Sequence, residues 1–254
     1  MRVLALDTTT RAGSVALVDD NVIVEERPGD LSRTHAQRLP AEVLAVLDAH
    51  GIELSAIDVF AVAAGPGSFT GLRIGLATIQ GLAFVTGRPI VGISALEALA
   101  HVASREVAAG ALVAPWMDAQ RREVFSALYR VTSAGLFDPG RLIELESAAV
   151  GDPQCTLERW RNRLDPSTGF EPGSVVFVGD GAVLYKDLVC GKGGASPRVM
   201  APTLLAGAVG RMAVARARLG DAVDPGEVHP IYVRRPDAEI DRERRTIDRQ
   251  KREG

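Results

Sequence analysis

The feature that most constrains the fold is an order of segments that occurs twice along the chain. The apolar run RVLALD ends at Asp7, and the apolar run ALVAPWMD ends at Asp118. Each is followed by β-rich segments, a segment with helical periodicity and a strand that enters a Gly-x-Gly turn, at Gly65 and at Gly179. This order predicts two α/β lobes of the same architecture. Because strands that end near an aspartate are common, coincidence is the alternative.

Local patterns place the expected elements. The residues Ser94 and Glu97 have the spacing of a capping box, which marks the start of a helix, and Thr203 is expected to cap the last long helix. The expected strands are 2–7, a hairpin over 13–27, 58–64, 88–93, 111–118, 122–131, 141–147 and 174–182, and the expected helices are 31–52, 70–86, 94–103, 153–164 and 203–220.

The stretch GPGSFTGLRIG, residues 65–75, is rich in glycine and follows a predicted strand, as phosphate-binding loops do. It does not match a P-loop, because Leu and Arg follow Gly71 where Lys and Ser or Thr are required. It does not match the dinucleotide-binding pattern either, because three residues rather than two separate Gly67 from Gly71. We expect Ser68 or Thr70 to cap the following helix.

That helix is apolar on every side. Between residues 72 and 85 its only charged residue is Arg73. One face, with Leu72, Leu76, Ile79 and Ala83, is expected to pack on the sheet, and the other carries Ile74, Ala77, Gly81 and Val85. A helix that is apolar all round must be covered on both faces, so the second face predicts a protein partner, with burial against the helix at 35–50 as the alternative. Gly71 and Gly75 are expected to let another helix approach closely.

Composition and charge exclude several classes of protein. The net charge of −3 and the pI of about 5.9 do not fit a domain that binds nucleic acid by itself. The two cysteines, Cys155 and Cys190, lack the spacing of a zinc site or a disulfide framework. The run before Asp7 is too short for a signal peptide, and no stretch is expected to reach the ~18 apolar residues of a membrane span. We therefore expect a cytoplasmic protein that does not bind a membrane.

Five stretches of the sequence resemble the TsaB (YeaZ) family. They are LALDTTT at 4–10, GPGSFTGLRIG at 65–75, GISALEALA at 92–100, DAQRREVFSALY at 118–129 and PIYVR at 230–234, in that order along the chain. The resemblance and the repeat together imply an α/β protein with the duplicated, two-lobed actin-like or Hsp70-like ATPase fold, which is ribonuclease H-like. The first lobe is expected to cover 1–103, completed by a helix and a strand within 201–236, and the second to cover 104–200. The charged tail, 237–254, is expected to be disordered or to form a solvated helix.

The resemblance also implies a function. Proteins of this family are non-catalytic partner subunits of a TsaD-type catalytic subunit. With a TsaE-type ATPase, that complex transfers threonylcarbamoyl to the adenosine beside the anticodon of tRNAs. The resemblance further implies self-association as a homodimer, contact with tRNA only through the complex, and no cofactor except ATP or ADP at the interface with the catalytic subunit. The expected partner-binding residues are His35, Leu39, Gly71, Leu72, Ile74, Gly75 and Thr78.

The alternative is a nucleotide-dependent kinase or ATPase that uses Asp7 and Asp118. In an actin-like fold these carboxylates, with Gly65 and Gly67, would lie near the phosphates and a magnesium ion. However, DAQRREV after Asp118 offers no glycine for a second phosphate loop. No metal site is expected, because no two histidines have the i, i+4 spacing that places both imidazoles on one helix face.

Overall fold

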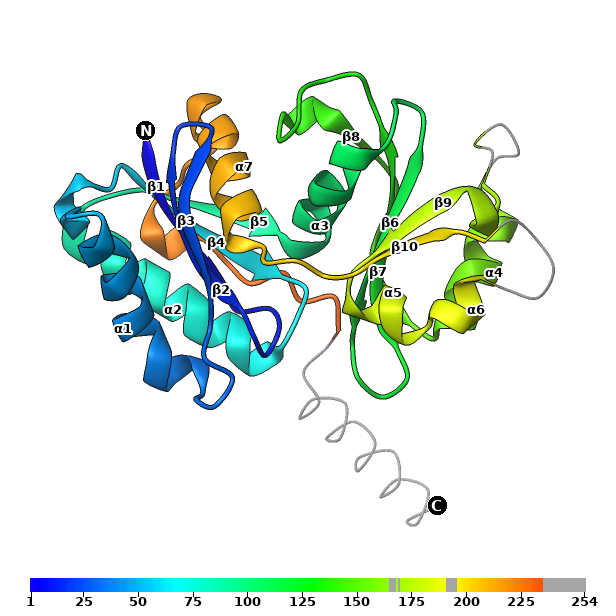
Figure 1. Cartoon of the computed structure of the whole chain (residues 1–254), viewed down its shortest axis with the longest axis horizontal. Helices are drawn as coiled ribbons and strands as arrows, with labels where there is room; N and C mark the ends of the chain where they lie inside the picture. Colours follow the sequence, from blue (N-terminus) through cyan, green and yellow to red (C-terminus); the bar gives the residue numbers. More distant parts are fainter. Residues whose placement is uncertain (165–167, 169, 191–195, 235–254) are drawn as a thin grey trace, which may run out of the picture.

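The chain folds into two lobes that lie side by side (Figure 1), in a computed structural model that describes residues 1–164, 168, 170–190 and 196–234. The sheet of the first lobe has the strand order β3-β2-β1-β4-β5, and that of the second has the order β10-β9-β6-β7-β8. Both contain a three-stranded antiparallel meander followed by two parallel strands. The predicted duplicated actin-like α/β fold is confirmed. The predicted charged tail, 237–254, lies outside the described residues.

Most elements follow the sequence periodicity, but the strand expected over 174–182 ends at Val178 and a helix begins at Asp180. The first sheet contains β1 (Arg2–Asp7), β2 (Ser14–Asp19), β3 (Val22–Pro28), β4 (Val59–Gly65) and β5 (Ile90–Ser94). The second contains β6 (Leu112–Asp118), β7 (Val124–Val131), β8 (Leu142–Gly151), β9 (Val175–Val178) and β10 (Arg198–Met200). The helices are α1 (His35–Ala49), α2 (Phe69–Thr86), α3 (Ala95–Ala103), α4 (Pro153–Arg163), α5 (Asp180–Leu184), α6 (Lys186–Cys190) and α7 (Ala206–Arg218), and single-turn 3₁₀ helices include η2 (Ser104–Glu106), η3 (Pro139–Arg141) and η6 (Pro225–Glu227).

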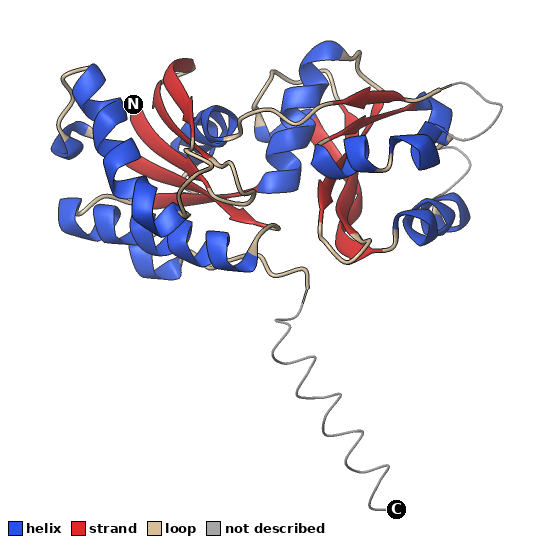
Figure 2. Ribbon diagram, turned by 60° about the horizontal axis from the view of Figure 1, so that its bottom comes forward, coloured by secondary structure: helices blue, strands red, loops and turns tan. Residues whose placement is uncertain are grey.

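Helices cover the sheets (Figure 2). In the first lobe α1 and α2 pack on one face of the sheet, and α7 packs on the other. In the second lobe α4 and α5 pack on the face that carries Trp116 and Phe177. Helix α3 contacts α7 and both sheets, so the largest core lies between the lobes and joins them. The lobes therefore share buried surface and do not meet only through a linker.

The start of α7 differs from the prediction. Its N-cap position is Leu205, which has no side-chain cap, and the expected Thr203 cap is not formed. Side chains of the first sheet accept hydrogen bonds from the first amides of α7 instead. Ser14 Oγ accepts from the Ala206 N–H at 3.0 Å, and a Glu26 carboxylate oxygen accepts from the Gly207 N–H at 2.8 Å. These partners are far away in sequence, so no local pattern could have indicated them.

Two further expectations need correction. Helix α2 is long and apolar enough, by composition, to cross a membrane, and it is the one such helix in the described ranges. It packs on α1 and β4, as a core helix does, but only 33% of it is buried.

The strand expected near the C-terminus is not formed in the described residues, because residues 228–234 belong to neither sheet.

Candidate functional site

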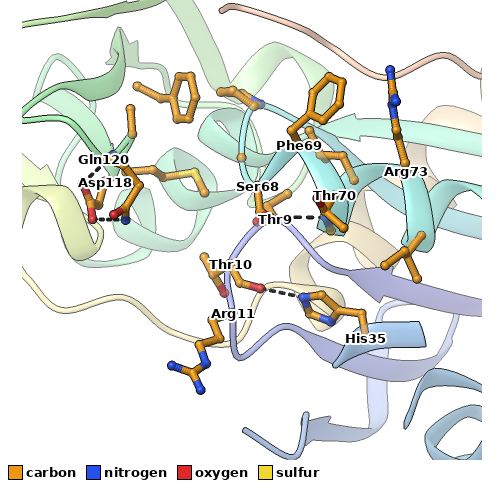
Figure 3. A pocket seen from close by; sticks show the side chains of 18 of the residues that line it. Thr9, Thr10, Arg11, His35, Ser68, Phe69, Thr70, Arg73, Asp118 and Gln120 are labelled. Carbon is orange, nitrogen blue, oxygen red and sulfur yellow. Dashed lines mark hydrogen bonds between the residues drawn. The ribbon is translucent and has the colours of Figure 1, made fainter. Parts of the chain in front are cut away.

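A cavity of about 1130 Å³ lies between the lobes. Its walls come from the β1–β2 loop, the start of α1, the first turns of α2, the β6–β7 loop and residues 231–234. The lining residues labelled in Figure 3 are Thr9, Thr10, Arg11, His35, Ser68, Phe69, Thr70, Arg73, Asp118 and Gln120. Of the residues predicted to lie near a nucleotide, Gly67 and Asp118 line this cavity, whereas Asp7 and Gly65 do not.

Asp7 is sealed beneath the β1–β2 loop. The residue is 3% exposed, and its Oδ1 accepts hydrogen bonds from the Thr9 N–H at 2.9 Å and from the Thr9 hydroxyl at 2.6 Å. Burial raises the pKa of the Asp7 carboxyl, and the two bonds from Thr9 oppose that rise. The Asp7 Oδ1 therefore closes a turn of its own loop, and Asp7 is not among the residues that line the cavity.

The loop before α2 packs directly on the β1–β2 loop. The Ser68 N–H donates to the Thr9 carbonyl at 2.7 Å, and a Cβ at Gly67 would lie 2.6 Å from Thr9 Cβ. Ser68 Oγ accepts from the Gly71 N–H at 3.2 Å, which confirms the predicted helix cap. A phosphate loop needs free amides that point at the ligand, but here the Ser68 amide is used by the protein itself.

The two helix glycines have a role that differs from the predicted one. A Cβ at Gly71 would lie 2.2 Å from the Thr8 carbonyl oxygen, and a Cβ at Gly75 would lie 2.1 Å from the Thr8 hydroxyl. Both glycines are buried. The expectation that they admit another helix is therefore wrong, because they admit the β1–β2 loop of the same chain.

The corresponding turn of the second lobe is more open. Asp118 is half-buried, and its two carboxylate oxygens accept from the backbone and side-chain amides of Gln120, at 2.8 and 2.6 Å. The Asp118 N–H donates to Asp180 at 3.0 Å, and burial raises the pKa of the Asp180 carboxyl. Gln120, Arg121 and Arg122 have consecutive left-handed φ values of 60°, 56° and 63°, which are uncommon for residues other than glycine.

His35 joins the start of α1 to the β1–β2 loop (Figure 3). Its Nε2 lies 3.1 Å from the Thr10 carbonyl oxygen, and its Nδ1 lies 2.8 Å from a guanidinium nitrogen of Arg38. Burial, with a smaller contribution from Arg38, lowers the pKa of His35. These contacts fit a neutral ring that donates from Nε2 and accepts at Nδ1. Among the described residues, no group of three or more His, Cys, Asp or Glu side chains is placed to hold a metal ion.

The predicted partner-binding residues divide into two groups. Leu39, Gly71, Leu72 and Gly75 are buried in their own lobe, whereas His35, Ile74 and Thr78 are half-buried. The first group is therefore buried within the chain itself. Leu39 lies in the core beneath α1 and α2, and Gly71 and Gly75 pack against Thr8. Contact between the second group and another protein stays a prediction.

The outer face of α2 is apolar and exposed, as its sequence pattern predicted. Ala77, Gly81 and Val85 lie on this face, and the predicted inner residues Leu72, Leu76, Ile79 and Ala83 are all buried. The sequence interpretation missed Phe84, which is 80% exposed, and Leu44 on α1, which is 57% exposed. Phe84 lies three positions after Gly81, so helical spacing could have identified it.

Comparisons with known proteins agree with the motifs. The family model for TsaD, tRNA N6-adenosine threonylcarbamoyltransferase, matches residues 20–241. The Escherichia coli tRNA threonylcarbamoyladenosine biosynthesis protein TsaB is 36% identical over 191 residues, covering 74% of this chain and 75% of the relative. The chain belongs to the TsaB (YeaZ) family.

Solved structures support the same assignment. YeaZ from Pseudomonas aeruginosa superposes with a TM-score of 0.70 and 31% identity, covering 91% of this chain and 99% of that protein. A tRNA N6-adenosine threonylcarbamoyltransferase from Solidesulfovibrio magneticus is 42% identical over 83 residues, which are 32% of this chain and 22% of that enzyme. This chain is thus similar in sequence both to the biosynthesis protein and, over a shorter stretch, to the transferase.

Proposed function

We propose that this chain is a non-catalytic partner subunit in tRNA threonylcarbamoyladenosine biosynthesis. It binds and supports a TsaD-type catalytic subunit, which works with a TsaE-type ATPase to transfer threonylcarbamoyl to the adenosine beside the anticodon. Membership of the TsaB family supports the pathway, and the match to the TsaD family model supports the choice of partner. Because the protein would work where tRNA is modified, we propose that it is located in the cytoplasm.

The observation that carries this proposal is the exposed apolar surface of α1 and α2. Phe84 and Val85 are 80% and 81% exposed on α2, and Leu44 is 57% exposed on α1. We call these three residues, together with the exposed Pro40, Ala41, Ala45, Ala77 and Gly81, the α1–α2 outer face. Large apolar side chains gathered on one exposed face mark interaction sites more often than single exposed ones do. The short side chains between them suit close packing against a partner's helices.

The proposal includes self-association of this chain through the same surface. A second copy of this chain presents the same apolar helices, and an isologous dimer buries like against like. The homodimer and the complex with the catalytic subunit then compete for one face, so that the catalytic subunit displaces one copy from the other. ATP or ADP belongs, on this proposal, at the junction with the catalytic subunit rather than in a site that this chain builds alone.

The arrangement of the inter-lobe turns supports a non-catalytic role. Asp7 is sealed under Thr9, and the Ser68 amide is bonded to the Thr9 carbonyl. An ATPase of this fold would need the first carboxylate and the loop amides to reach the phosphates and a magnesium ion. The alternative kinase or ATPase function, through Asp7 and Asp118, therefore has the weaker support.

Binding to the TsaD-type subunit of the same organism tests the proposal. Val85→Glu places a charge on the exposed last turn of α2, within the α1–α2 outer face. It should weaken binding about tenfold or more in calorimetry, because the charge loses water on association. Ile143→Glu is the matched control, since Ile143 is a 52% exposed residue of β8 in the other lobe. Equal affinities for wild type and Val85→Glu would refute this surface assignment.

Val85 suits this experiment better than the buried helix residues. Charges at Leu72 or Gly75 would disturb the core or collide with Thr8, so loss of binding there would not distinguish a lost surface from a lost fold. Thermal unfolding of Val85→Glu should match that of the wild type within about 0.5 kcal/mol, as expected for an exposed site.

A further inference from the structure

Three sequence motifs that are far apart in the chain meet at the mouth of the cavity. GPGSFTGLRIG begins α2 in the first lobe, DAQRREVF forms the β6–β7 loop of the second, and PIYVR is the last described segment of the chain. In Figure 1 this segment, coloured orange, leaves the first lobe and runs between the two lobes. The TsaB-family assignment gives no role to this meeting point.

The first half of the segment is fastened to the first lobe. The Ile231 N–H donates to the Ala64 carbonyl at 2.7 Å. A Cβ at Gly65 would lie 2.7 Å from the Ile231 carbonyl oxygen, and Gly65 has a φ of 123°, so a side chain there is excluded both by space and by backbone conformation. Gly65, which was expected near a nucleotide, instead makes room for this segment.

Tyr232 extends the attachment to α2. Its ring lies 5.2 Å from the Phe69 ring, and its hydroxyl accepts a hydrogen bond from Arg73 Nε at 3.0 Å. The Arg73 guanidinium lies 3.9 Å from the centre of the Phe69 ring and 5.9 Å from that of Tyr232. Cation–π and aromatic contacts of this kind attach Tyr232 to the start of α2.

The second half of the segment is fastened to the second lobe. Arg234 donates to the Ala119 carbonyl at 2.6 Å and forms an ion pair with Glu123. Its guanidinium lies 5.6 Å from the Phe125 ring, and Val233 packs on the core shared by the lobes. Four consecutive residues therefore connect the two walls of the cavity, and all four line it.

A second connection between the lobes is made by Phe137, in the β7–β8 loop. Its ring stacks on His101 of α3 at 5.7 Å and lies under the Arg211 guanidinium of α7 at 4.4 Å. Phe137 has a left-handed φ of 66°, a genuine outlier for a bulky residue. None of these three side chains lines the cavity, so this joint is separate from the segment at the cavity mouth.

We propose that residues 231–234 are a strap that fastens the two lobes across the mouth of the cavity, and that its release opens the cavity about the Phe137 joint. In the fastened state Tyr232 of the strap contacts Phe69 and Arg73 at the start of α2. Release breaks the Arg234 contacts with the β6–β7 loop while the core around α3 stays intact. This is a hinge closure, in which Arg234 makes the polar contacts of the strap with the second lobe.

Distances between the lobes test the strap. Spin labels are placed at the exposed residues Asp48 and Arg161, as cysteines, after Cys155 and Cys190 are replaced by serine. We expect Arg234→Glu to broaden the measured distance distribution about twofold or lengthen its mean, because the new charge repels Glu123.

Two further variants make the outcome specific. Glu123→Arg combined with Arg234→Glu restores the ion pair in the opposite sense and should return the distribution toward that of the wild type. Arg218→Glu is the control, because Arg218 pairs with Asp20 within the first lobe, and it should leave the distribution unchanged. A wild-type distribution in Arg234→Glu, or no recovery in the double variant, would overturn the proposal.

Hydrogen exchange gives a second measurement should Arg234→Glu fold poorly. In the milder Arg234→Ala variant, amides of residues 69–73 should exchange faster than in the wild type, whereas amides of α3 should not change. Unchanged exchange at residues 69–73 contradicts the strap, and equally faster exchange throughout the chain assigns Arg234 to general stability instead.

Discussion

The turns after β1 and β6 occupy equivalent places in the two lobes but have different surroundings. In the first, Asp7 is 3% exposed and both hydrogen bonds to its Oδ1 come from Thr9. In the second, Asp118 is half-buried, lines the cavity and is followed by three left-handed residues. The repeat preserved the strand and its terminal carboxylate, and the two turns diverged around them.

The helices that follow explain the divergence. In the first lobe the 18-residue α2 lies against the β1–β2 loop, which reaches into the space left by Gly71 and Gly75. In the second lobe the corresponding helix, α5, has only 5 residues and contacts the end of β6 through Gly181. A long, closely packed helix seals one turn while a short helix leaves the other open. One closed turn and one open turn do not make a pair of phosphate loops, and only the closed turn packs against α2.

The largest effect is expected where the close packing of α2 on the β1–β2 loop of the first lobe is disrupted. Gly71→Ala should destabilise the protein by about 3 kcal/mol in chemical denaturation, because its Cβ would collide with the Thr8 backbone carbonyl, which cannot rotate away. Gly81→Ala is the matched control on the same helix. No atom lies within 4 Å of its Cβ position, so it should stabilise the protein by roughly 0.5–1 kcal/mol. Equal effects at the two sites would contradict the close approach.

The next largest effect on stability is expected from His101, in the joint between the lobes. His101 is fully buried, neither ring nitrogen has a hydrogen-bond partner, and burial lowers its pKa to about 4. The unfolded chain, with the ordinary histidine pKa of about 6.5, binds a proton that the folded chain excludes, so stability falls as the pH falls from 7 toward 4.

His101→Leu removes this dependence. Between pH 7 and pH 5 the free energy of unfolding should fall by about 2 kcal/mol less in the variant than in the wild type. Arg216, Arg141 and Asp138 also act on this ring, and all three remain in both proteins, so the difference between the two curves isolates His101. Parallel curves in urea titrations at the two pH values would show that the ring is not excluded from protonation.

The contribution of Asp7 to stability has the opposite pH dependence to that of His101. Because burial raises the pKa of Asp7, the folded chain keeps this proton to higher pH than the unfolded chain does, and stability falls as the pH rises above about 4. Asp7→Asn can accept the same two hydrogen bonds from Thr9 without ionising. Its stability relative to the wild type should therefore increase from pH 4 to pH 7, which urea titrations can measure. A constant difference would mean that Asp7 is not desolvated.

The smallest effect concerns the open turn. Arg122 has a φ of 63° in the β6–β7 loop. Arg122→Gly should raise the free energy of unfolding by up to about 1 kcal/mol, because glycine adopts this conformation without strain. A loss of stability would show that side-chain contacts of Arg122 outweigh the strain. The β1–β2 turn of the first lobe offers no such gain in stability, because its residue with a left-handed φ, Gly13, is already a glycine.

Much of the fold could be predicted from the sequence because its signals are local. Alternation and apolar runs identified the strands, and the Ser94 cap and the Ser68 cap follow from side chains within three residues of the amides that they accept from. The inner face of α2 followed from its helical period. These contacts all lie within one or two helical turns of the residues that make them.

The site was less predictable because it depends on contacts between distant segments. The amides at the start of α7 are bonded by Ser14 and Glu26, about 190 residues away in the case of Ser14. Gly71 signals a need for space, but the sequence does not say whether the space is filled by a partner or, as the structure shows, by Thr8. The same ambiguity applies to Leu72, which was expected at an interface and is buried in this chain.

The central claim is that this chain contributes a surface and not an active site. It is tested most directly by the rate of threonylcarbamoyl transfer to tRNA in a complex reconstituted from this chain, a TsaD-type subunit, a TsaE-type ATPase and the threonylcarbamoyl-adenylate donor. We predict that Asp7→Asn keeps the wild-type rate and that Val85→Glu reduces it about tenfold or more, with recovery at high concentrations of the variant. Loss of the rate in Asp7→Asn, with complex formation intact, would contradict the account.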